Sequence, residues 1–220
     1  MIHLYCVVLE LEELPRVPGL DGAPLEHRRI DGFELVVSKT ARELPEVSEE
    51  AVLRHASIVE ELMARSRAVL PAQFGRAFAD EDELSDAVRE KAPELERSLS
   101  RVQGCLEFGL RVLGDRPADE HGSTGFSGSD YMHTRLAETR ERNRLLQELH
   151  EPFTRLSRAS ARFGGASGEL FQGAYLVPEE NADAFRENVR RLETDNPELT
   201  VVCTGPWPPY TFAVEREGHP

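Results

Sequence analysis

Residues 105–113, CLEFGLRVL, have the clearest strand pattern of the chain. Every second residue from 106 to 112 is apolar, whereas the positions between them are polar or glycine: Glu107, Gly109 and Arg111. Such alternation is typical of a strand with one buried and one solvent-facing side. We therefore expect a half-buried strand here, with Glu107 on its solvent side.

The residues that follow predict the rest of one sheet. In chain order, we expect a long helix from about 129 to 157, a poorly marked strand near 158–169, a strand over Phe171–Val177, a helix that ends at Asn196-Pro197, and a strand over Leu199–Thr204. With the strand at 105–113 in front, this is the β-α-β-β-α-β order of a ferredoxin-like unit. The predicted fold class is α+β, and residues 103–220 form its C-terminal domain.

Residues 1–102 predict a separate N-terminal α+β domain. Apolar strands cover 2–9 and 33–39, the second preceded by the tight-turn dipeptide Asp31-Gly32. Ser48 and Asp80 open two helices as N-cap residues. Pro93 is expected to break or restart the second helix, because its ring clashes with the preceding turn.

The glycine- and serine-rich segment 114–128 is expected to be a mobile loop. Its glycines lack the spacing of a dinucleotide-binding loop, and no Gly-Lys-Ser/Thr follows them. Ser127 and Ser167 each lack the glycine two residues later that a nucleophile elbow requires. The segment therefore gives no catalytic or phosphate-binding motif.

Composition limits the partners. The 220 residues include 40 acidic side chains against 26 Lys and Arg, a net charge of -14. Nucleic acid is not expected as a partner, because phosphate binding needs local cations. No run approaches the ~20 apolar residues of a membrane helix, and the N-terminal residues lack the features of a signal peptide. The widely spaced Cys6, Cys105 and Cys203 indicate free thiols in the cytoplasm.

Titratable side chains predict no reaction centre. The seven histidines include no pair at metal-ligand spacing, and we expect His55 to be packed or hydrogen-bonded beside the apolar stripe of its helix. Acidic runs such as ADEDELSD indicate solvated faces. The sequence therefore predicts no catalytic residue, metal, cofactor or small-molecule substrate.

Seven stretches, in order, resemble the gas vesicle protein family GvpL/GvpF: LYCVV, HASIVEELM, LPAQFGRAF, LEFGLRV, SGSDYM, GAYLV and GPWPPYTF. The closing G-P-W-P-P-Y-[ST]-F is the most specific of them. Two positions depart from the family pattern, namely Gln73 where a basic residue is usual and Phe108 where Trp or Met is frequent. The resemblance does not separate the L from the F members.

The resemblance implies a non-enzymatic accessory or minor structural protein of gas vesicles, located in the cytoplasm and needed for vesicle assembly. Its implied partners are the small hydrophobic shell protein, bound at a face or edge of the C-terminal sheet, and other accessory proteins. The alternatives are a stoichiometric wall component on the gas-facing side or a small enzyme. The family motifs supply the candidate structural or contact residues: Phe74, Gly75, Tyr175, Gly205, Pro206, Trp207, Pro208, Pro209 and Tyr210.

The segment GPWPPYTF contains the only tryptophan of the chain. Its three prolines exclude a helix and predict a stiff corner between two strands. We expect Trp207 to fold back over apolar neighbours, with direct contact to a partner as the alternative. We also expect Tyr210–Glu215 to form an extra edge strand of the C-terminal domain.

Overall fold

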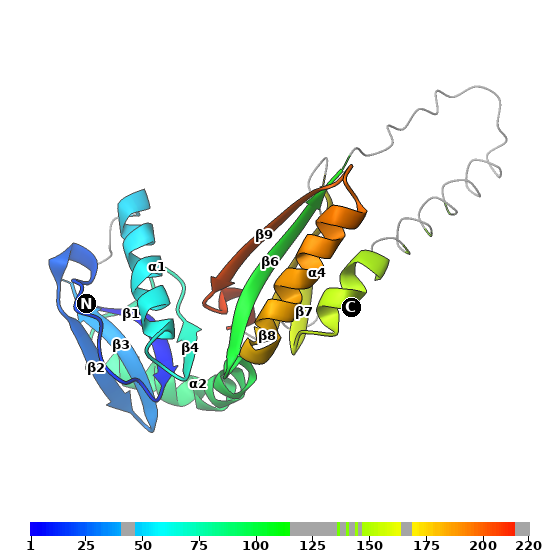
Figure 1. The fold of residues 1–220 in the computed structure, drawn as a ribbon. Helices are drawn as coiled ribbons and strands as arrows, with labels where there is room; N and C mark the ends of the chain where they lie inside the picture. Colours follow the sequence, from blue (N-terminus) through cyan, green and yellow to red (C-terminus); the bar gives the residue numbers. More distant parts are fainter. Residues whose placement is uncertain are drawn as a thin grey trace. The chain divides into compact units, whose positions relative to one another are not determined.

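The computed structural model describes residues 1–40, 47–114, 147–163 and 169–213, together with 136, 140 and 144. The described chain forms an α+β fold with two separate sheets, which confirms the predicted fold class (Figure 1). It divides into two units, residues 1–107 with the segment from Pro206 onward, and residues 108–205. The predicted loop at 114–128 and the first part of the predicted long helix lie outside the described residues.

The first unit is built on a five-stranded sheet. Its strands are β1 (Ile2–Leu9), β2 (Leu25–Ile30), β3 (Phe33–Lys39), β4 (Ala68–Pro71) and β5 (Ala77–Phe78). They lie in the order β2-β3-β1-β4, and β5 also pairs with β1. Asp31 and Gly32 join β2 to β3 with φ angles of 47° and 89°, the left-handed conformation that a two-residue hairpin turn requires.

Two helices cover this sheet, α1 (Glu49–Met63) and α2 (Glu81–Val102). Each begins at its predicted N-cap: the hydroxyl of Ser48 accepts from the amide of Ala51 at 3.2 Å, and Asp80 Oδ1 accepts from the amide of Glu83 at 2.9 Å. Helix α1 buries Ile58, Val59 and Leu62 in a core shared with Tyr5, Cys6, Val8, Leu20, Val36 and Val69.

The expected break at Pro93 is wrong, because α2 is one helix of 22 residues, Glu81–Val102, that includes Pro93. A proline inside a helix removes one backbone hydrogen bond. Pro93 is exposed, so the carbonyl that loses its partner can bind water instead. The cost of the interruption is therefore tolerated on the outer side of the helix.

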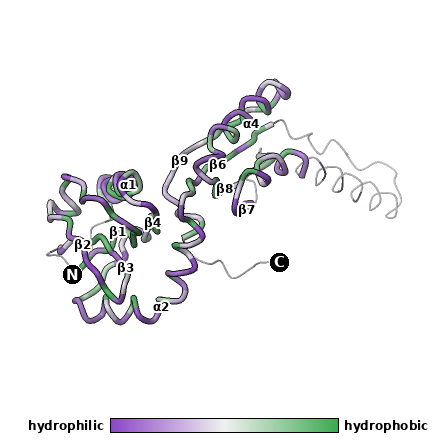
Figure 2. The backbone as a smooth tube through the Cα atoms, turned by 60° about the horizontal axis from the view of Figure 1, so that its bottom comes forward, coloured by the Kyte–Doolittle hydropathy of each residue, from purple (hydrophilic) through white to green (hydrophobic). Residues whose placement is uncertain are grey.

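The second sheet contains β6 (Cys105–Leu113), β7 (Ala159–Phe163), β8 (Glu169–Pro178) and β9 (Thr200–Trp207), in the order β7-β8-β6-β9. The poorly marked strand near 158–169 is thus β7. Helix α4 (Ala182–Asp195) precedes β9, and residues 147–154 are also helical. Figure 2 shows hydrophilic and hydrophobic residues alternating along α1 and α4, as expected for helices with one buried face.

Aromatic side chains form the core of the second unit. The ring of Phe185 on α4 lies 5.0 Å from Phe108 on β6, 5.0 Å from Phe153 and 5.3 Å from Tyr175 on β8. All four are at most 1% exposed. Phe108, which stands where Trp or Met is frequent in the family, is therefore a core residue. Its ring fills the space that those side chains would occupy.

Candidate protein-binding surface

Strand β9 is an edge of its sheet, because among the described strands it pairs only with β6. From Leu199 to Ala213 the sequence contains no charged residue and no histidine, in a chain that is 30% charged. Val202 on this strand is 40% exposed. Natural edge strands are usually protected by charges, and this one is protected only by Pro206 near its end.

Two other edge strands, β2 and β7, differ in this respect. Edge strand β2 includes Glu26, Arg28 and Arg29, and edge strand β7 of the second sheet includes Arg162. Charged side chains on an edge discourage pairing with another chain. Of these three strands, β9 therefore offers the edge with the least electrostatic protection.

Close packing holds β9 against its neighbour. A Cβ atom at Gly109 of β6 would lie 2.6 Å from the Thr204 hydroxyl of β9. Glycine at this position therefore leaves room for the Thr204 side chain on that face of the sheet. Gly205, with φ 105°, follows at once and turns the chain as only glycine does without strain.

Beyond Gly205 the chain enters the first unit as a tight turn. Pro206 and Trp207 still belong to β9, so the predicted corner begins later than expected. Pro208 and Pro209 are buried, and Tyr210–Phe212 is a short 3-10 helix. The expected edge strand over Tyr210–Glu215 is therefore wrong for its first residues, and 214 and 215 lie outside the described part.

Trp207 does not fold into the core as expected, because 43% of its surface is exposed. Tyr210 is 39% exposed, whereas Phe212 and Ala213 are buried. The prolines and Phe212 anchor the turn, and its two largest side chains remain accessible. Burial of part of its ring, with smaller contributions from Cys6 and Glu60, raises the pKa of Tyr210, which keeps the phenol neutral.

Two side chains from the first unit bind the turn. The carboxylate of Glu107 accepts the amide of Thr211 at 2.9 Å and the Thr211 hydroxyl at 2.6 Å. Arg101 Nη2 donates to the carbonyl of Phe212 at 2.8 Å. The expectation that Glu107 lies on the solvent side of its strand is wrong, since only 9% of it is exposed. Sequence alternation alone gave no sign of these contacts.

The remaining motif residues lie elsewhere. Phe74 packs beside two buried histidines, with its ring 6.0 Å from His3 and 5.8 Å from His55. Gly75 has φ 86° and turns the chain between β4 and β5. Tyr175 is fully buried in the second unit. Six of the nine motif residues, Gly205–Tyr210, form one continuous segment. The other three lie in different parts of the structure.

The two histidines form a buried pair. His3 Nε2 lies 3.0 Å from His55 Nδ1, and His55 Nε2 lies 3.0 Å from the carbonyl of Ala72. Burial, and then the neighbouring His55, lower the pKa of His3 to about 4. Burial also lowers the pKa of His55. The packed, hydrogen-bonded role expected for His55 is confirmed.

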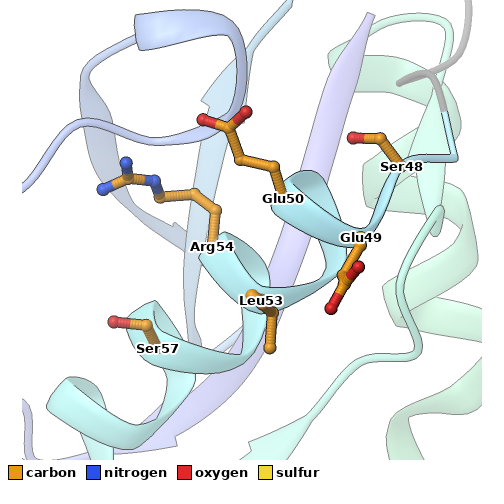
Figure 3. Close-up of a pocket in the computed structure, with 6 residues that line it drawn as sticks. All are labelled: Ser48, Glu49, Glu50, Leu53, Arg54 and Ser57. Carbon is orange, nitrogen blue, oxygen red and sulfur yellow. The ribbon is translucent and has the colours of Figure 1, made fainter.

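A shallow depression of about 690 Å³ runs along α1 and is lined by Ser48, Glu49, Glu50, Leu53, Arg54 and Ser57 (Figure 3). All six come from one helix and its cap, so groups from different elements do not converge there as they do in most enzyme sites. Across the described residues, no cluster of His, Cys, Asp and Glu is arranged to hold a metal ion. No described helix has both the length and the apolar character needed to cross a membrane.

Fold and surface together define an α+β protein in which an uncharged edge strand is followed along the chain by a turn that exposes Trp207 and Tyr210. The family model described as "Gas vesicle synthesis protein GvpL/GvpF" matches residues 1–214, and the chain belongs to this family. The family is one of gas vesicle proteins and is not a known enzyme family.

Individual relatives agree with this assignment. The chain is 28% identical to gas vesicle protein F1 of Halobacterium salinarum, over 93% of this chain and 89% of that protein. It is 27% identical to gas vesicle protein L of a Streptomyces species, over 66% of this chain and 62% of that protein. The crystal structure of GvpF from Anabaena sp. PCC7120 matches with a TM-score of 0.81 at 20% identity, covering 99% of this chain and 98% of that one.

Proposed function

We propose that this chain is an accessory protein needed for gas vesicle assembly, and that it binds the small hydrophobic shell protein at the open edge of β9. The observation that carries the proposal is the uncharged edge strand in a chain of net charge -14. Membership of the GvpL/GvpF family supports the link to gas vesicles. The binding site and the partner are our inference.

A shell subunit apolar enough to line a gas space exposes surface that aggregates in water. An edge strand offers unpaired backbone N–H and C=O groups, which an extended segment of another chain can pair with. The acidic surface elsewhere on this protein keeps such a complex dispersed, because like charges repel.

Further parts of the proposal follow from the family and the fold. We place the protein at the gas vesicle in the cytoplasm, without enzymatic activity, and expect other gas vesicle accessory proteins among its partners. We also infer that the second sheet is a modified ferredoxin-like unit. The strand order β9-β6-β8-β7 supports this, because it places the first and third strands at the centre.

Capture of the shell protein tests the site. Val202→Lys adds to β9 the kind of charge that protects other edge strands. We expect the parent chain to hold purified shell protein in solution and recover it in pull-down, and Val202→Lys to lose most of this recovery. The matched control is Leu53→Lys, which makes a similar change at a residue of α1 that is 61% exposed. Shell protein that stays insoluble and uncaptured with the parent chain would contradict the proposal.

Two cellular experiments separate an assembly factor from a wall component. Deletion of this chain in a vesicle-forming host should abolish gas-filled vesicles seen by electron microscopy. Washed, intact vesicles should retain little of the chain if it acts transiently during assembly. Stoichiometric retention after washing would instead support a structural component of the wall.

A further inference from the structure

The turn at residues 207–212, called here the aromatic turn, is fixed from two directions. Glu107 accepts both the amide and the hydroxyl of Thr211, and Arg101 donates to the carbonyl of the next residue, Phe212. Hydrogen bonds to an ionised carboxylate are stronger than those between neutral groups. These contacts hold the backbone of the turn without using either of its exposed rings.

The turn is also stiff by itself. Pro208 and Pro209 fix two consecutive φ angles, and both rings are buried. The amide of Tyr210 donates to the carbonyl of Pro208 at 2.7 Å, and the amide of Phe212 donates to the carbonyl of Pro209 at 3.1 Å. The backbone beneath the exposed Trp207 and Tyr210 therefore has little freedom left to lose on binding.

We propose that Trp207 and Tyr210 form a preorganised contact surface for an uncharged, apolar segment of the shell protein, and that Glu107 and Arg101 are positioning residues for this surface. The inference rests on the proposed function, since it names where part of that partner docks. Interface energy concentrates in a few aromatic anchors, and a rigid anchor avoids much of the ordering cost of association.

Charge argues for this occupant. The aromatic turn and the strand before it form an uncharged window, residues 199–213, in a strongly acidic chain. A basic partner would gain nothing from Glu107, because this carboxylate is buried and already bound to Thr211. The one other carboxylate that acts on Tyr210 among the described residues is Glu60 of α1. An apolar segment carries no charge of its own that must lose its hydration when the segment covers this window.

The only tryptophan of the chain provides the probe. The full-length protein, labelled with 5-fluorotryptophan, gives a single fluorine resonance from Trp207 in NMR. Unlabelled shell protein should shift or broaden this resonance as the complex forms. Trp207→Ala should weaken capture of the shell protein by at least about tenfold. Leu53→Ala, which truncates an exposed apolar residue of α1, should leave capture unchanged.

The positioning role needs a separate pair of variants. Thr211→Val removes only the hydroxyl that Glu107 accepts, and Thr211→Ser restores it in a smaller side chain. We expect Thr211→Val to speed amide hydrogen exchange in residues 207–213 and to weaken capture severalfold. Both effects are measured well below the melting temperature, where the fold is intact, and Thr211→Ser should recover most of the affinity.

The outcomes are distinct. If pull-down recovers the shell protein but the Trp207 resonance does not change at saturation, the contact surface lies elsewhere and the inference fails while the proposed function stands. If Thr211→Val exchanges faster but binds as tightly as the parent chain, Glu107 does not position the surface. If the parent chain captures no shell protein, the proposed function and this inference both fail.

Discussion

Acidification should destabilise this protein through its buried histidine pair. The carbonyl of Ala72 accepts from His55 Nε2, so the His55 Nδ1 lone pair accepts from His3 Nε2. His3 Nδ1 is then an unprotonated nitrogen, buried without a hydrogen-bond partner among the described residues. A proton added there would be a buried charge beside a second imidazole, which is why the pKa of His3 falls to about 4.

The magnitude follows from linkage. The folded pKa of His3 lies below its ordinary value of 6.5, so protonation favours the unfolded chain. The contribution of neutral His3 to the free energy of unfolding is therefore complete above pH 6.5 and is lost as the pH falls toward 4. Each pH unit in this window costs about 1.4 kcal/mol, which gives a loss of about 2 kcal/mol at about pH 5 from His3. The lowered pKa of His55 acts in the same direction.

Urea unfolding followed by far-UV circular dichroism measures this loss. His3→Gln is the matched variant, because its amide keeps a donor for His55 but does not titrate. Carboxylates and the histidines outside this pair contribute equally in both proteins. We expect the variant to be less stable at neutral pH, yet to lose about 2 kcal/mol less than the parent chain on acidification to about pH 5. Parallel stability curves for the two proteins would show that His3 does not cause this loss.

Three further substitutions test the packing. Gly109→Ala should lower the free energy of unfolding by about 0.5–1.5 kcal/mol, because its methyl group would push the exposed Thr204 hydroxyl out of its rotamer; an unchanged melting curve would contradict this close approach. Phe185→Ala should cost about 3–5 kcal/mol in urea unfolding, since it empties the centre of a four-ring cluster; a cost below 1 kcal/mol would mean that the cluster collapses around the gap. Pro93→Ala should raise the melting temperature, because it restores a helical hydrogen bond at an exposed site, and a lower melting temperature would argue against this.

Much of the fold was predictable because short-range patterns encode it. The apolar runs of β1 and β3, the Asp31-Gly32 turn and the N-caps Ser48 and Asp80 all lie where the sequence indicates. Hydrophobic periodicity and capping residues act within a few positions, so one sequence is enough to read them. The order of elements in the second sheet is also encoded in this way.

The errors have a different physical origin. Glu107 was assigned to the solvent side because its neighbours alternate, but its partner Thr211 lies 104 residues further along the chain. A proline-stiffened corner between two strands predicts that Trp207 folds back over apolar neighbours, but in the structure Pro208, Pro209 and Phe212 are the buried residues of this turn. Such long-range pairings leave no periodic trace, and the candidate surface depends on them.

The return of the chain to its first unit has a consequence for synthesis on the ribosome. The strands and helices of residues 1–102 emerge early, but the segment from Pro206 onward, which Glu107 and Arg101 bind, is among the last described residues to leave the exit tunnel. Domains generally fold as units during translation. Here the first unit gains its final segment only when translation has passed residue 212, so a chain that terminates before Pro206 never presents Trp207 and Tyr210.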